Sequence, residues 1–129
     1  MTHPGPFSPT VMEHFLNPAF SGTLPQANGE ATAGSVERGV FIQMQVLFDV
    51  DRVRNVRFRA YGCVPAIAAS DCLASWATHR PVTEIMMLTP ADLIDRLGGL
   101  PPHRHFCAEL AVEALQAAIQ DAQHKQVAA

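Results

Sequence analysis

The sequence predicts an α+β fold: a small antiparallel β-sheet of about three strands, helices packed on one face of it, and a long C-terminal helix. Two observations lead to this prediction. Apolar and polar residues alternate over residues 41–61, and after Pro65 the apolar residues recur at helical spacing. The length of 129 residues suits one hydrophobic core. We therefore expect residues 1–129 to form a single domain, with a flexible lead-in over residues 1–8.

The N-terminal third predicts one short helix followed by a loop. Ser8 and Thr10 are both residue types that cap helices, and an apolar stripe follows them. The Asn17–Pro18 pair ends this helix, because proline restricts the residue before it. The chain is then rich in glycine as far as Gly39, which predicts a loop with a short strand near residues 31–36.

A β-hairpin follows, with strands over residues 41–50 and 53–61. In both segments one set of alternate positions is apolar, and the other set is mainly polar or charged. The intervening residues 49–52 form the turn. Arg57 and Arg59 fall on the polar set, so we expect them on a solvated strand face.

Helical spacing dominates the rest of the chain. One helix is expected from residue 65 to about residue 80, and one or two short helices over residues 81–98. The Gly98–Gly99 pair stops the second of these. After two prolines, a long helix is expected from about residue 103 to residue 124.

Composition excludes several classes of protein. The net charge is −3 and no basic run is present, so nucleic acid is not an expected partner. No apolar stretch reaches the ~18 residues of a membrane span, and the N-terminus lacks the pattern of a secretory signal. The odd number of 3 cysteines argues for reduced thiols rather than a disulfide framework. We therefore expect a cytoplasmic protein that does not bind membranes.

Two of the cysteines stand where helices are expected to begin. Cys63 precedes Pro65 at the start of one helix, and Cys107 lies in the first turn of the last helix. Unpaired N–H groups at a helix start favour negative charge, and a thiolate is the form that binds metal or attacks sulfur. His103 and His105 could add nitrogen ligands. The competing interpretation is that both cysteines only fill space in the core.

The order of several motifs resembles the U-type iron–sulfur cluster assembly scaffolds, which include the N-terminal domain of NifU-type proteins. The matching segments are "VMEHFLNP", "GTLPQANGEATAG", "VRFRAYGC", "AIAAS…W" and "LPP…C…LA…AL.AAI", and they span residues 8 to about 124. The resemblance implies a small α+β scaffold with three cysteines, an aspartate and a histidine at one end. It further implies that a cysteine desulfurase supplies sulfur, that a [2Fe-2S] cluster is built and passed on, and that zinc can occupy the same pocket.

The chain departs from this family at the first ligand cysteine. In the resemblance, Cys63 and Cys107 match two of the three cysteines. The family's C-G-D segment reads "RGV" here, so Arg38 stands in the cysteine position and Val40 in the aspartate position. Asp71, on the helix that follows Cys63, is a candidate replacement for the lost carboxylate.

The family's remaining site residues are also altered. Phe106 occupies the position of the histidine, and His105 lies one residue earlier. Cys72 matches no ligand and is expected in the core. The chaperone-binding segment keeps its leucine and two prolines but has His103 in place of valine, so docking of an Hsp70-type chaperone is in doubt.

The resemblance therefore implies a non-enzymatic scaffold that binds iron or a cluster, or accepts sulfur, at Cys63 and Cys107, with His105 as a third metal ligand. A [2Fe-2S] cluster needs four protein ligands, so one chain is a donor short. Two subunits of a homodimer could pool their cysteines, or a single zinc or iron ion could bind with a water molecule as its fourth ligand.

Alternatively, the chain is a metal-free interaction module that regulates the cysteine desulfurase. Arg38 could also hold an anion or a persulfide. The third hypothesis is a small thiol enzyme, with Cys107 as nucleophile and His105 as base.

Overall fold

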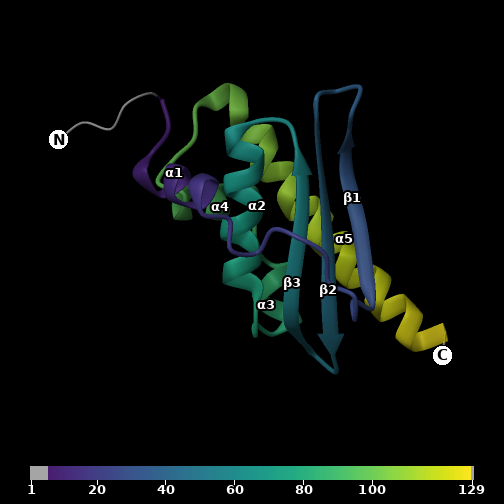
Figure 1. Ribbon diagram of the computed structural model, residues 1–129. Helices are drawn as coiled ribbons and strands as arrows, with labels where there is room; N and C mark the ends of the chain where they lie inside the picture. The colour runs from purple at the N-terminus through teal and green to yellow at the C-terminus, as the bar shows by residue number, and fades with distance from the viewer. Residues whose placement is uncertain (1–5, 129) are drawn as a thin grey trace.

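The computed structural model describes residues 6–128, and a three-stranded antiparallel sheet forms its centre (Figure 1). The strands are β1 (Gly29–Ser35), β2 (Val40–Asp49) and β3 (Arg52–Tyr61), in that spatial order. The expected hairpin and the α+β class are confirmed. The first strand begins two residues before the expected segment at 31–36.

Helices make up the remaining elements. They are α1 (Pro9–Leu16), α2 (Val64–Ala77), α3 (Val82–Met86), α4 (Pro90–Arg96), the short 3-10 helix η1 (Pro102–Arg104) and α5 (His105–Ala128). The long helix α5 packs against β1 and β2, and α2 packs against β3, so both cover the same face of the sheet (Figure 1). The helix α1 lies on α2. No helix among residues 6–128 is long and apolar enough to cross a membrane.

Alternation along the strands divides the sheet into a buried and an exposed face. In β2 the buried positions run from Val40 to Phe48 at every second residue, and Val56 and Phe58 continue the buried face on β3. Arg59 is exposed on the other face, as expected. Burial of these side chains against the two helices supplies the main stabilisation, at roughly 25 cal/mol per Å² of apolar surface removed from water.

The N-terminal helix is fixed by its cap. The Ser8 hydroxyl oxygen accepts a hydrogen bond from the Val11 N–H at 3.1 Å, and the same hydroxyl donates to the Leu97 carbonyl. Of the expected lead-in at 1–8, residues 1–5 lie outside the described residues. Phe7 packs against the core. The N-terminal end of α1 is thus tied to the end of α4.

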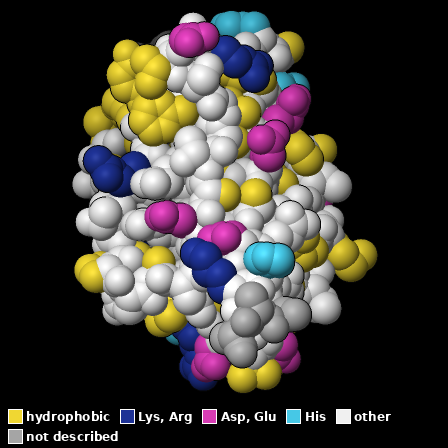
Figure 2. All heavy atoms as spheres, turned by 90° about the vertical axis from the view of Figure 1, so that its right-hand side faces the viewer, with side chains coloured by type: hydrophobic (Ala, Val, Ile, Leu, Met, Phe, Trp, Pro, Cys, Tyr) yellow, Lys and Arg dark blue, Asp and Glu magenta, His cyan; other side chains and the backbone are white. Residues whose placement is uncertain are grey.

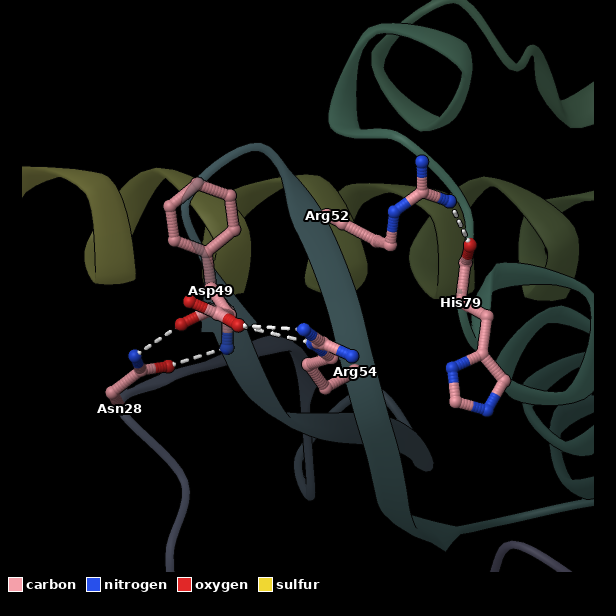
Figure 3. A network of polar contacts seen from close by, with 6 residues as sticks. Asn28, Asp49, Arg52, Arg54 and His79 are labelled. Carbon is pink, nitrogen blue, oxygen red and sulfur yellow. Dashed lines mark hydrogen bonds and ion pairs between the residues drawn. The ribbon is translucent and has the colours of Figure 1, made fainter.

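A polar network holds the β2–β3 turn at one end of the sheet (Figure 3). The Asn28 amide donates to the Phe48 carbonyl and accepts from the Phe48 N–H, both at 2.7 Å. The side chain of Arg54 pairs with Asp49 at 3.0 Å. These contacts clamp the turn beside the register shift at Leu47/Phe48, and they lie far along the strands from the cysteines.

The opposite end of the sheet gathers the segments that carry the cysteines. There β1 and β3 end and β2, α2 and α5 begin, at the top of Figure 1. Gly62 makes the turn from β3 into α2 with a φ of +137°. A Cβ at Gly62 would lie 2.8 Å from the Gly39 carbonyl oxygen, so the β1–β2 turn packs directly against it. The turn that contains Arg38 and the residue before Cys63 are therefore neighbours.

Candidate functional site

The thiols of Cys63 and Cys107 lie side by side. Their Sγ atoms are 3.5 Å apart, although the residues are 44 positions apart in the sequence. Both are free thiols, because an S–S bond would bring the sulfurs to about 2.05 Å. The expected meeting of the two cysteines is confirmed, while their role as ligands stays a prediction.

Cys63 occupies the N-cap position of α2. Its backbone is extended, and its carbonyl accepts hydrogen bonds from the Ala66 and Ile67 N–H groups. Its side chain is half-buried. The first N–H groups of a helix carry positive partial charge, and Cys63 lies at this end of α2.

Cys107 lies in the first turn of α5 and is 0% exposed. Burial raises the pKa of its thiol to about 12, and the charge and hydrogen bond of Cys63 add to this effect. The Arg104 guanidinium opposes the rise in pKa only in part. Cys107 therefore keeps its proton near neutral pH, and its sulfur is hydrogen-bonded to the Cys63 sulfur. The expectation that a helix start favours the thiolate is wrong for Cys107, because desolvation outweighs the helix terminus.

A cavity of about 400 Å³ opens beside Cys63. The side chains of Phe7, Phe15 and Ile67 form its apolar wall, and Arg104 contributes a positive charge. Cys63 lines this cavity, whereas Cys107 is enclosed in the protein and does not line it. The pair is therefore asymmetric, with an outer and an inner thiol.

The wall of this cavity was not predicted from the sequence. Phe15 belongs to the apolar stripe of the first helix, which predicted burial but not the neighbour. Phe7 falls in the proline-rich lead-in. The sequence signal for both is that a large aromatic residue stands just before the first helix and another near its end. In the structure this helix packs on α2, next to Cys63.

Neither Arg38 nor Val40, at the positions of the family's first cysteine and aspartate, offers a metal ligand beside the thiols. Val40 is 4% exposed, and its side chain lies against Gly62, where a Cβ would be 2.8 Å from the Val40 Cγ2. Arg38 is exposed in the β1–β2 turn. An apolar side chain thus fills the place that the resemblance gives to a carboxylate.

His105 directs its ring at the backbone. Its Nε2 lies 2.9 Å from the Leu100 carbonyl oxygen, so this nitrogen carries a proton and donates. His103 is exposed in η1. Within residues 6–128, the structure assembles no group of three or more His, Cys, Asp or Glu side chains that could hold a metal ion. The ligand role of His105 therefore stays a prediction.

Asp71 does not replace the lost carboxylate. It is 2% exposed, and one of its oxygens lies 2.7 Å from Nδ1 of His14 while the other accepts from the Phe20 N–H at 2.9 Å. Both oxygens therefore hold α1 and the following loop on α2. His14 on α1 is its partner. A lone aspartate on an apolar helix face was the signal that such a partner must exist.

A stacked aromatic pair lies on the exposed face of the sheet at this end of the molecule. The rings of Phe41 and Tyr61 stack at 5.6 Å between centroids, and Tyr61 is 52% exposed. Figure 2 shows hydrophobic side chains gathered at the upper left of one face, with acidic, basic and histidine side chains beside them at the top and further charged side chains below. The thiol end of the molecule thus offers apolar surface near the site.

The donor set at this site is smaller than a [2Fe-2S] cluster needs. Such a cluster takes four protein ligands, and the structure brings together two thiols. His105 is held by the Leu100 carbonyl and does not add a third donor in this structure. One chain in this conformation therefore does not complete the ligand shell of a cluster.

These features define a small α+β domain that carries a pair of thiols at one end of its sheet. The sequence profile of the NifU-like N terminal domain matches residues 7–129, so the chain belongs to the NifU-like N-terminal domain family.

Relatives of known name agree with this assignment. The iron–sulfur cluster assembly scaffold protein IscU of Aquifex aeolicus is 36% identical over 122 residues, which cover 93% of this chain and 78% of the relative. The nitrogen fixation protein NifU of Azospirillum brasilense is 32% identical over 117 residues, covering 88% of this chain and 38% of that protein.

Solved structures share the fold at lower identity. A NifU-like N-terminal protein from Brucella abortus superposes with a TM-score of 0.74 at 16% identity, covering 92% of this chain and 94% of that one. A putative scaffold protein for the SUF system from Fervidobacterium islandicum gives 0.70 at 20% identity, with 88% and 96% covered.

Proposed function

We propose that this chain is a scaffold for iron–sulfur cluster assembly, which receives iron, sulfur or a [2Fe-2S] cluster at Cys63 and Cys107. The observation that carries the proposal is the 3.5 Å separation of two thiols from different helices. Membership of the family and relatives named as assembly scaffolds support it. The iron and sulfide are cargo, so the protein is not an enzyme in this role.

Iron binding requires a change at the site, because Cys107 must lose its proton. The 3.5 Å between the two sulfurs suits ligation of one metal ion by both. A metal ion supplies the positive charge that makes a buried thiolate favourable, so binding releases protons. His105 or a water molecule completes the donors around a single iron, and zinc suits the same thiol and imidazole donors.

A cysteine desulfurase is the proposed sulfur donor. The half-buried Cys63, beside a cavity of about 400 Å³, is the thiol that a donor reaches first. An Hsp70-type chaperone is not part of the proposal, because Leu100 is 8% exposed and the valine of the chaperone segment is replaced by His103. Reduced thiols suit a cytoplasmic location.

The small thiol enzyme is disfavoured. Its nucleophile, Cys107, is 0% exposed, and its base, His105, is engaged by the Leu100 carbonyl.

Anaerobic reconstitution tests the proposal. The native protein is incubated with ferrous iron and inorganic sulfide, desalted, and analysed for bound iron and for its visible absorption spectrum. We expect bound iron with charge-transfer absorption, its loss in Cys63→Ser and Cys107→Ser, and its retention in Cys72→Ser, the matched control.

The metal-free interaction module predicts the opposite result. The native protein would then retain no iron, and the Cys63→Ser/Cys107→Ser double variant would still alter the activity of a cysteine desulfurase. That pair of results would overturn the scaffold assignment.

A further inference from the structure

The two thiols differ in access, and this difference sets an order of reaction. Cys63 is half-buried and lines the cavity beside Phe7 and Phe15, whereas Cys107 is 0% exposed. A donor molecule can therefore place a sulfur atom on Cys63, while Cys107 is shielded from it. The inner thiol is left unmodified and in contact with the outer one.

The inner thiol lies within reach of the sulfur it would attack. Its Sγ is 3.5 Å from the Cys63 Sγ, so an S–S bond of about 2.05 Å requires the two sulfurs to approach by only about 1.5 Å. Attack of a thiolate on a neighbouring sulfur through a mixed intermediate is the general route of thiol–disulfide exchange. Cys107 becomes that thiolate by giving up the proton that the departing outer sulfur takes.

We infer that Cys107 discharges a persulfide carried on Cys63 and thereby releases the sulfur as sulfide. The inference rests on the proposed role of Cys63 as a sulfur acceptor and goes beyond it by assigning a reductive step to the inner thiol. The scaffold would accept sulfur as a persulfide and deliver it as sulfide, which is the form of sulfur in a cluster.

Atoms and electrons balance over three steps. A donor persulfide, R–S–SH, transfers its outer sulfur to the Cys63 thiol and leaves as R–SH. The Cys107 sulfur then bonds to the Cys63 Sγ, the bond from that Sγ to the outer sulfur breaks, and the outer sulfur leaves as H₂S with the Cys107 proton. The two cysteine sulfurs are oxidised to a disulfide as the outer sulfur is reduced. Two low-molecular-weight thiols, R′–SH, reduce the disulfide and become R′–S–S–R′.

The surroundings suit the departing group. The cavity beside Cys63 has space for an added sulfur atom, and Arg104 lines it with a positive charge that attracts hydrosulfide. The second step converts both thiols of the pair to a disulfide. Each chain therefore discharges one sulfur atom and then needs low-molecular-weight thiols to reduce that disulfide before it can discharge another.

A single-turnover experiment tests this inference. Reduced protein is loaded anaerobically with glutathione persulfide and desalted at once to remove small thiols. Released sulfide is then measured by methylene blue formation, and the chain is followed by intact mass and by mapping of its disulfides. We expect the native protein to release one sulfide per chain and to acquire a Cys63–Cys107 disulfide, seen as the loss of two hydrogens.

Variants separate the two thiols. Cys107→Ser should retain the mass of one added sulfur atom on Cys63 and lose sulfide release, Cys63→Ser should lose both, and Cys72→Ser should behave as the native protein. Circular dichroism checks that each variant is folded, and the disulfide mapped in the native chain does not depend on any variant. Retention of the added sulfur by the native protein, or equally fast release from Cys107→Ser, would overturn the inference.

Iron reconstitution with inorganic sulfide bypasses the persulfide and separates this inference from the proposed function. Bound iron without discharge overturns the discharge step alone. Discharge without bound iron overturns the scaffold assignment while leaving the discharge step supported.

Discussion

At the scale of single residues, the site is defined by the unequal burial of two neighbouring thiols. Cys63 at the start of α2 is half-buried, whereas Cys107 is enclosed and has a pKa raised to about 12. Iodoacetamide near neutral pH should therefore label Cys63 first and Cys107 far more slowly. Because the thiolate fraction of Cys107 grows as pH rises toward its pKa, its labelling should accelerate with pH while the protein stays folded. Peptide mapping measures both rates, and equal labelling at neutral pH would contradict the assignment of outer and inner thiols.

Cys72 provides the internal reference for that experiment. It is 7% exposed, and burial raises the pKa of its thiol to about 11. This residue was expected in the core, and its burial confirms the expectation.

A second residue-scale prediction concerns Asp71. Its carboxylate accepts from the Phe20 N–H and contacts the His14 ring while 2% exposed, so removing it leaves two groups without a partner. Asp71→Ala should lower the free energy of unfolding by about 1–3 kcal/mol, measured by urea denaturation. Asp95→Ala, at an exposed position on α4, is the matched control and should stay within about 0.5 kcal/mol. Equal stability of the two variants would show that the buried contacts contribute nothing net.

At the scale of elements, α4 depends on a reciprocal cap. Thr89 Oγ1 accepts from the Asp92 N–H at 3.2 Å, and the Asp92 carboxylate accepts from the Thr89 N–H at 3.0 Å. Thr89→Ala should cost about 1 kcal/mol of stability in urea denaturation. Thr83→Ala, at an exposed position in α3, is the control and should change stability little.

The same cap has a pH dependence of known sign. The Thr89 N–H, with its hydroxyl, lowers the pKa of Asp92 below its usual 3.8. A carboxyl whose pKa is lower in the folded state stabilises the protein above its usual pKa and loses that effect as pH falls through the folded pKa. The difference between Thr89→Ala and the native protein should therefore be larger at pH 7 than in acid. A difference that grows on acidification would contradict this account.

Elements were predictable from sequence where local chemistry decides them. The alternation over 41–61 fixed both strands of the hairpin, and Ser8 caps α1 as one of the two expected residues. Contacts between distant segments were not predictable. The His14–Asp71 pair spans 57 positions, and the burial of Cys107 depends on how α5 packs on β1 and β2. Sequence therefore predicted which cysteines meet, but not which of them faces the cavity.

At the scale of the whole molecule, the fold brings the β1–β2 turn to the thiols but supplies no third sulfur. Arg38 is exposed in that turn, and the carbonyl of the next residue, Gly39, packs against Gly62, the neighbour of Cys63. The turn that carries position 38 therefore lies at the same end of the sheet as the two thiols. Because the position is exposed, Arg38→Cys should leave stability within about 0.5 kcal/mol.

If the chain binds iron through thiols at this end, Arg38→Cys should retain more iron per chain after anaerobic reconstitution and desalting than the native protein. The added thiolate removes a repelling positive charge and contributes a donor toward the four that a [2Fe-2S] cluster requires. Arg38→Ala removes the charge without adding sulfur, so it separates the two effects. Iron retention that rises equally in both variants would assign the effect to charge alone. No rise in Arg38→Cys would show that a thiol at position 38 does not reach the metal and would contradict this prediction.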